Sequence, residues 1–68
     1  MLSNGEKLEI INQHLRSLHY LIYNAELDIL EANAVSTVDR VLVSGIEDRL
    51  VSLNAKVSVL EAEKAKLA

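Results

Sequence analysis

The stretch EANAVSTVDRV, residues 31–41, lies at the middle of the chain and decides whether the protein folds back on itself. It contains neither glycine nor proline, the two residues that most often mark a turn. Its polar residues are nevertheless suited to ending one helix and starting another. Asn33 can adopt the left-handed conformation that closes a helix. Ser36 is followed three residues later by Asp39, a spacing typical of a helix start with the carboxylate in the positive first turn.

We therefore predict an all-α protein in which two long helices form an antiparallel hairpin. A single domain should cover residues 1–68, with a first helix over about 4–33, a loop over about 34–37 and a second helix over about 37–66. At the start of the first helix, Ser3 and Glu6 have the spacing of a capping box, in which each side chain binds the other residue's backbone amide.

Apolar residues recur at alternating intervals of three and four on both sides of the central stretch, as on one face of a helix. The first series is Leu8, Ile11, Leu15, Leu18, Ile22, Ala25, Ile29 and Ala32, and the second is Val43, Ile46, Leu50, Leu53, Val57, Leu60, Lys64 and Leu67. In a hairpin the two series face each other, with Ile11 near Leu60. The expected hairpin core is Ile11, Leu15, Leu18, Ile22, Ile46, Leu50, Leu53, Val57 and Leu60.

One alternative remains open at this point, because the two series share a single phase through Ser36 and Asp39. The whole chain can be read as one continuous coiled-coil helix of about 60 residues, roughly 90 Å long at 1.5 Å per residue. Gly45 lies inside the second series. It either lets a neighbouring helix approach closely or is tolerated at a cost of about 1 kcal/mol relative to alanine.

Size and composition favour a protein that associates. A compact chain of 68 residues buries only about 60% of the surface that it exposes when unfolded, so its stability alone is marginal. The chain has no cysteine, which excludes disulfides and thiolate metal sites. The net charge of −3 argues against nucleic acid as a partner. No membrane-spanning segment or signal peptide is expected, so a cytoplasmic location is predicted.

A second apolar stripe lies on a different face of the first helix, and the arm that folds back cannot cover both faces. We expect this surplus to be buried between chains, most simply in a four-helix bundle of two hairpins, although a trimer or a complex with another helical protein would bury it equally. The predicted oligomer interface is Tyr20, Tyr23, Leu27, Leu30, Ala34, Leu42 and Val51. Tyrosine suits such a contact because its ring can be buried while its hydroxyl stays at the rim.

No residue pattern predicts a catalytic, cofactor or metal site, and we expect no enzyme. His14 and His19 are five residues apart, which places them on different faces of a helix, so they lack the i,i+4 spacing of zinc-binding helices. Lys64 is expected to mark the end of the bundle, with its stem on apolar surface and its charge in water. Small dimeric helical hairpins that bind RNA have a similar layout, but no stripe of arginine and lysine forms here.

The segments ELDILEANAVS, leading into the loop, and LEAEKAKL, near the end of the chain, resemble the layout of short uncharacterised helical proteins of tailed bacteriophages. The resemblance spans the chain and implies an accessory or minor structural protein, acting in the host cytoplasm or the virion. The leading hypothesis is thus a non-enzymatic assembly protein, acting as a homodimer or as a small subunit of a larger complex. The alternatives are a regulatory module that binds RNA or a partner protein and, third, an enzyme subunit whose active residues lie on another chain.

Overall fold

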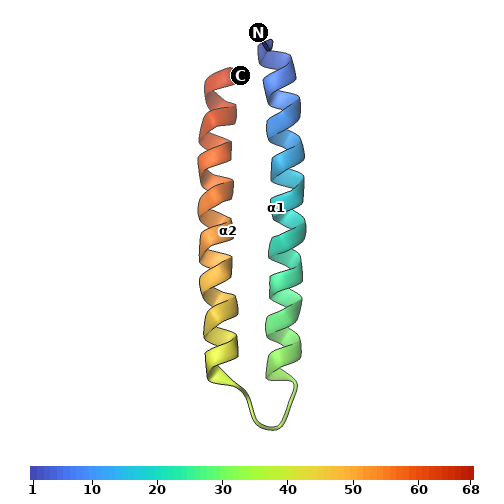
Figure 1. The fold of residues 1–68 in the computed structure, drawn as a ribbon, viewed down its shortest axis with the longest axis vertical. Coiled ribbons are helices and arrows are strands. Elements are labelled where there is room, and N and C mark those ends of the chain that lie inside the picture. The colour runs from blue at the N-terminus through green and yellow to red at the C-terminus, as the bar shows by residue number, and fades with distance from the viewer.

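The computed structural model describes residues 1–68 and contains two helices and no strand. The helices are α1 (Asn4–Asn33) and α2 (Arg40–Leu67). The helices run antiparallel and pack along their length, so both ends of the chain lie at the same end of the molecule (Figure 1). The Cα atoms span 54 × 16 × 14 Å. The predicted hairpin is confirmed, and the single rod of about 90 Å is excluded for this chain.

The start of α1 is fixed by the capping box that the sequence predicts. The Glu6 amide donates to the Ser3 hydroxyl at 3.1 Å, and the Ser3 amide donates to the Glu6 carboxylate at 3.0 Å. The amide of Ser3, with the Ser3 hydroxyl adding to the effect, holds the pKa of Glu6 below its ordinary value. Two amides that lack partners inside the helix are satisfied in this way.

The end of α1 differs from the prediction. Asn33 is its last residue, but no residue of the chain has a positive φ, so the left-handed closure by Asn33 was wrong. Ala34 instead keeps a right-handed backbone (φ −77°, ψ −14°) and its amide donates to the Glu31 carbonyl at 3.2 Å. This bond from residue i to i−3 tightens the last turn and leaves the reversal to the following loop.

The second helix begins three residues later than predicted, at Arg40 rather than at about residue 37. Its cap is Asp39, whose carboxylate accepts hydrogen bonds from the amides of Val41 at 3.0 Å and Leu42 at 3.1 Å. The interpretation of Ser36 as the cap was therefore wrong. The Asp39 carboxylate accepts two amides at once and carries the negative charge that the helix dipole favours at the first turn.

The core of the hairpin is the seam between the two helices, made of the two apolar series. The sixteen seam positions are all buried or half-buried, and every other residue of the chain is exposed. The most deeply buried are Leu15, Ala25, Ile46 and Leu53, with exposed fractions between 1% and 7%. The seam is thus one residue layer thick, and nothing on the outer side of either helix is covered.

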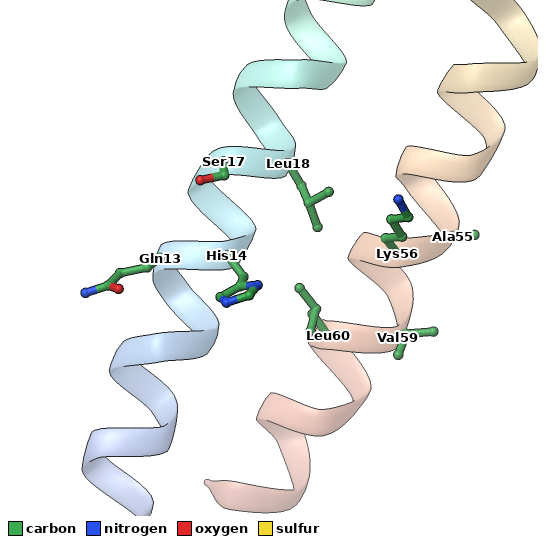
Figure 2. A pocket seen from close by; sticks show the side chains of 8 residues that line it. All are labelled: Gln13, His14, Ser17, Leu18, Ala55, Lys56, Val59 and Leu60. Atoms are coloured by element: carbon green, nitrogen blue, oxygen red, sulfur yellow. The ribbon is translucent and has the colours of Figure 1, made fainter.

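The pairing of the arms is displaced from the predicted register. We expected Ile11 to lie near Leu60, but Leu60 shares a groove with His14 and Leu18, one to two turns nearer the loop (Figure 2). This placement fits a register in which Leu60 lies opposite Leu15, four residues from the predicted partner Ile11.

The remaining interactions between the arms are few. Arg49 on α2 forms an ion pair with Asp28 on α1 at 3.2 Å, and both side chains are about half exposed. A pair in that environment stabilises a protein by about 0.2–1 kcal/mol. No atom lies within 4 Å of the position that a Cβ would occupy at Gly45, so nothing in the hairpin approaches this glycine closely.

Candidate interaction surface

The most extensive uncovered apolar feature is on α1. We call it the outer α1 stripe and define it as Tyr20, Tyr23, Leu27, Leu30 and Ala34. The exposed fractions of its large members are 69% for Tyr20, 61% for Tyr23, 37% for Leu27 and 67% for Leu30, and Ala34 is also exposed. All five residues belong to the predicted oligomer interface. The structure places them together on one face, at intervals of three and four residues.

The outer α1 stripe faces mainly away from α2, and only Tyr20 and Tyr23 also line a groove with Glu61 and Lys64 of α2. At 100° per residue, its mean direction lies roughly 150° around the helix axis from that of the seam. In this half of the helix the outward-facing positions carry no formal charge until Glu31: they are Ser17, Tyr20, Tyr23, Asn24, Leu27 and Leu30. The charged residues Glu26 and Asp28 flank the seam instead. An outer face normally carries the charged residues of a soluble helix, so this arrangement is reversed.

The two interface residues predicted on α2 lie apart from that stripe. Leu42 is 53% exposed and borders a groove with Asp28 and Arg49, beside the seam. Val51 is 70% exposed and projects to the other side of α2. A partner helix seated on the outer α1 stripe therefore does not reach Leu42 and Val51 together. The spacing pattern identified Leu42 and Val51 as apolar residues outside the seam, but it did not show where they lie relative to the outer α1 stripe.

The total surface gives a measure of what is left uncovered. The chain exposes 5245 Å², whereas a compact monomer of 7.5 kDa exposes about 4,250 Å² by the usual relation between mass and surface. The excess of about 1,000 Å² is close to the roughly 800 Å² that each partner contributes to a standard protein interface. The elongated hairpin thus has spare surface of the size that one contact with another protein takes up.

The polar residues between the arms form shallow grooves. His14 lies with Lys56, Leu18 and Leu60 in one of them, where Leu18 and Leu60 turn toward the space between the helices and Gln13 points away from it (Figure 2). This groove was not anticipated from the sequence, because the pairing of the arms had to be known to place Lys56 beside His14.

His19 lines a different groove, together with Glu61 and Lys64. The two histidines therefore lie on opposite sides of the seam, as their five-residue spacing predicts. No three histidine, aspartate or glutamate side chains converge on a point where a metal ion could bind. Lys64 is half-buried in the seam near the open end of the hairpin, where its stem covers apolar surface.

Comparison of the chain with protein families, with curated proteins and with solved structures returns no match. Neither α1 nor α2 combines the length and the apolar character that a bilayer-spanning helix requires.

Proposed function

We propose that this chain is a non-enzymatic assembly protein that acts by packing its helices against another protein, in the simplest case a second copy of itself. The observation that carries the proposal is the outer α1 stripe, whose four large side chains lie between the charged residues Arg16 and Glu31 on the side of the hairpin that faces solvent. Faces of this kind mark sites of protein interaction when they are contiguous and large.

The size of the stripe supports a specific contact. The exposed surface of its four large residues equals that of more than two fully exposed residues. At about 200 Å² per residue, this is an area on the order of 450 Å². A standard interface covers roughly 800 Å² on each partner, so these four side chains alone would supply about half of one side. Scattered apolar residues, such as Ile10 and Leu21, do not form such a face.

We further propose a biological setting from the resemblance of the sequence pattern to short helical proteins of tailed bacteriophages. A homodimer, or a small subunit of a larger helical complex, would then serve in the host cytoplasm or in the virion. The partner in the larger complex would present a helix of complementary apolar surface to the same stripe.

The test uses paired variants with equal chemical change. Leu27→Gln combined with Leu30→Gln removes two large members of the stripe, whereas Ile10→Gln combined with Leu21→Gln removes two exposed apolar residues outside it. Molar mass is measured by light scattering over a dilution series, and helicity by circular dichroism. We expect the stripe variant to be monomeric where the unmodified chain and the control variant are oligomeric, with helicity retained in all three. Equal masses for the two double variants would refute the proposed contact.

A further inference from the structure

We propose that the partner on the outer α1 stripe is a second copy of the chain whose α1 runs antiparallel to the first, about a two-fold axis that passes beside Ala25. The inference rests on the proposed function and specifies the partner and its orientation. The resulting dimer is a row of four helices, in the order α2, α1, the partner's α1 and the partner's α2. It differs from the compact four-helix bundle that the sequence suggested.

The direction of the stripe supports the row. In a square bundle each helix meets its two neighbours at about a right angle, so a second hairpin would contact α1 at roughly 90° from the seam. The outer α1 stripe lies roughly 150° from the seam at 100° per residue. A helix seated on it is therefore nearly in line with α2 and α1, and it can reach α2 only beside Tyr20 and Tyr23, whose groove also contains Glu61 and Lys64.

The spacing of the stripe fits an antiparallel copy of itself. When the residue numbers of facing positions add up to 50, Tyr20 lies opposite the partner's Leu30, and Tyr23 lies opposite the partner's Leu27. Each of these pairs occurs twice by symmetry, so all four large side chains of both copies are covered. A tyrosine against a leucine in every layer matches a large ring with an aliphatic side chain of smaller volume. Isologous contacts of this kind are the commonest in homo-oligomers.

Charges at the ends of the stripe select the antiparallel orientation. Arg16 lies on the same face one turn before Tyr20 and borders the groove that contains Tyr20 and Tyr23. In the register above it falls opposite the partner's Ala34 and within one turn of the partner's Glu31. The two ion pairs of the hairpin join Arg49 to Asp28 and Lys66 to Glu63, so Arg16 and Glu31 have no ionic partner within their own chain.

A parallel contact would have the opposite effect, because it places each residue opposite its own copy. Arg16 would then face the partner's Arg16, and Glu31 the partner's Glu31. Like charges in register destabilise helix pairs. The antiparallel contact gives two complementary charge pairs per dimer from the same residues.

The outer face of α2 in a second copy is the other surface on which the stripe could pack, and the experiment below distinguishes this contact. The outward positions of α2 combine small residues, such as Ser44 and Ala55, with the exposed valines Val41, Val51 and Val59, and a copy could seat the stripe there. Such a contact joins unlike faces, so it repeats from copy to copy and gives rings or open filaments rather than a dimer.

Distances between spin labels distinguish these arrangements. The chain has no cysteine, so Lys7→Cys and Leu21→Cys each supply one attachment site, and neither residue belongs to the outer α1 stripe. In the antiparallel dimer the two labels at residue 21 lie about 20 Å apart. Those at residue 7 lie about 55 Å apart, because each is 18 residues from the axis at 1.5 Å per residue. A parallel pair gives short distances at both sites, and a head-to-tail array gives similar distances at both.

A charge exchange provides a second, independent readout. Arg16→Glu alone and Glu31→Arg alone should each raise the dimer dissociation constant about three- to tenfold, since two complementary contacts become repulsive. The double variant should return it to within about twofold of the unmodified chain. Independent, additive losses in the double variant would overturn the inference.

The outcomes separate the inference from the proposed function. Absence of any distance between molecules, with a monomer mass at all concentrations, refutes both. A stable oligomer with short distances at residue 7 overturns the antiparallel arrangement and leaves assembly through the stripe intact.

Discussion

Replacement of the cap residue Asp39 by alanine should destabilise the hairpin more than any other single change in the loop. One carboxylate oxygen of Asp39 accepts the amides of Val41 and Leu42 at 3.0 and 3.1 Å. Both amides belong to the first turn of α2 and lose their partner in Asp39→Ala. Loss of a side-chain cap of this type costs about 1 kcal/mol, within a range of about 0.5–2 kcal/mol. In a chain of this size that corresponds to a fall in Tm of roughly 4–8 °C.

The matched control is Ser36→Ala, which removes the hydroxyl that the sequence marked as the cap. Ser36 makes no side-chain hydrogen bond in the structure and should change stability by less than about 0.5 kcal/mol. Asp39→Asn should fall between the two, since it keeps an acceptor but loses the charge at the helix start. Thermal and urea unfolding are followed by circular dichroism at one protein concentration, because the Tm of an associating protein depends on concentration. If Ser36→Ala costs as much as Asp39→Ala, the placement of the helix start is wrong.

Two further predictions concern glycine and pH. Gly45→Ala should stabilise the hairpin by about 0.5–1 kcal/mol without changing its molar mass, because alanine favours helix and no side chain lies within 4 Å of the new methyl group. Stability is measured by urea unfolding and molar mass by light scattering. A loss of stability or of the oligomer would show that a helix packs on Gly45. Since the pKa of Glu6 is lower in the folded chain than its unfolded value near 4.5, its stabilising effect is complete above that value and is lost as the pH falls through the folded pKa. Unfolding of Glu6→Gln compared with the unmodified chain between pH 6 and 3 should show a difference that disappears at the acid end, whereas a constant difference would contradict the capping box as its source.

Most of the fold can be predicted from the sequence because the spacing of the apolar residues identifies the seam. Intervals of three and four define one face of each helix, and in the structure those positions are buried or half-buried while all others are exposed. The start of α1 was equally accessible, because Ser3 and Glu6 interact only with each other's backbone and side chain. Local patterns of this kind need no knowledge of the rest of the fold.

The start of α2 and the register could not be predicted in the same way. Ser36 and Asp39 are both competent caps, and the choice between them depends on where α2 must begin for its seam to meet that of α1. A seven-residue repeat also allows several registers, each of which pairs apolar residues. With α2 starting at Arg40, Val43 can lie opposite Ala32, and every seam residue has a counterpart. In the predicted pairing of Ile11 with Leu60, Ala32 would instead lie opposite the polar Asp39.

For the candidate interaction surface, the sequence identified apolar residues in excess of what one partner arm can cover. It did not give the direction in which they point, since that depends on the position of the seam. Once α2 is in place, the outer α1 stripe separates from Leu42 and Val51, and it becomes a face that a single helix can cover.

Sedimentation equilibrium of the unmodified chain shows whether a second chain shields the apolar face that the hairpin leaves exposed. We expect a mass near 15 kDa, twice 7.5 kDa, at about 100 μM, and a decrease toward 7.5 kDa on dilution to well below the dissociation constant. A chain that is fully helical, soluble and 7.5 kDa at about 1 mM would contradict it.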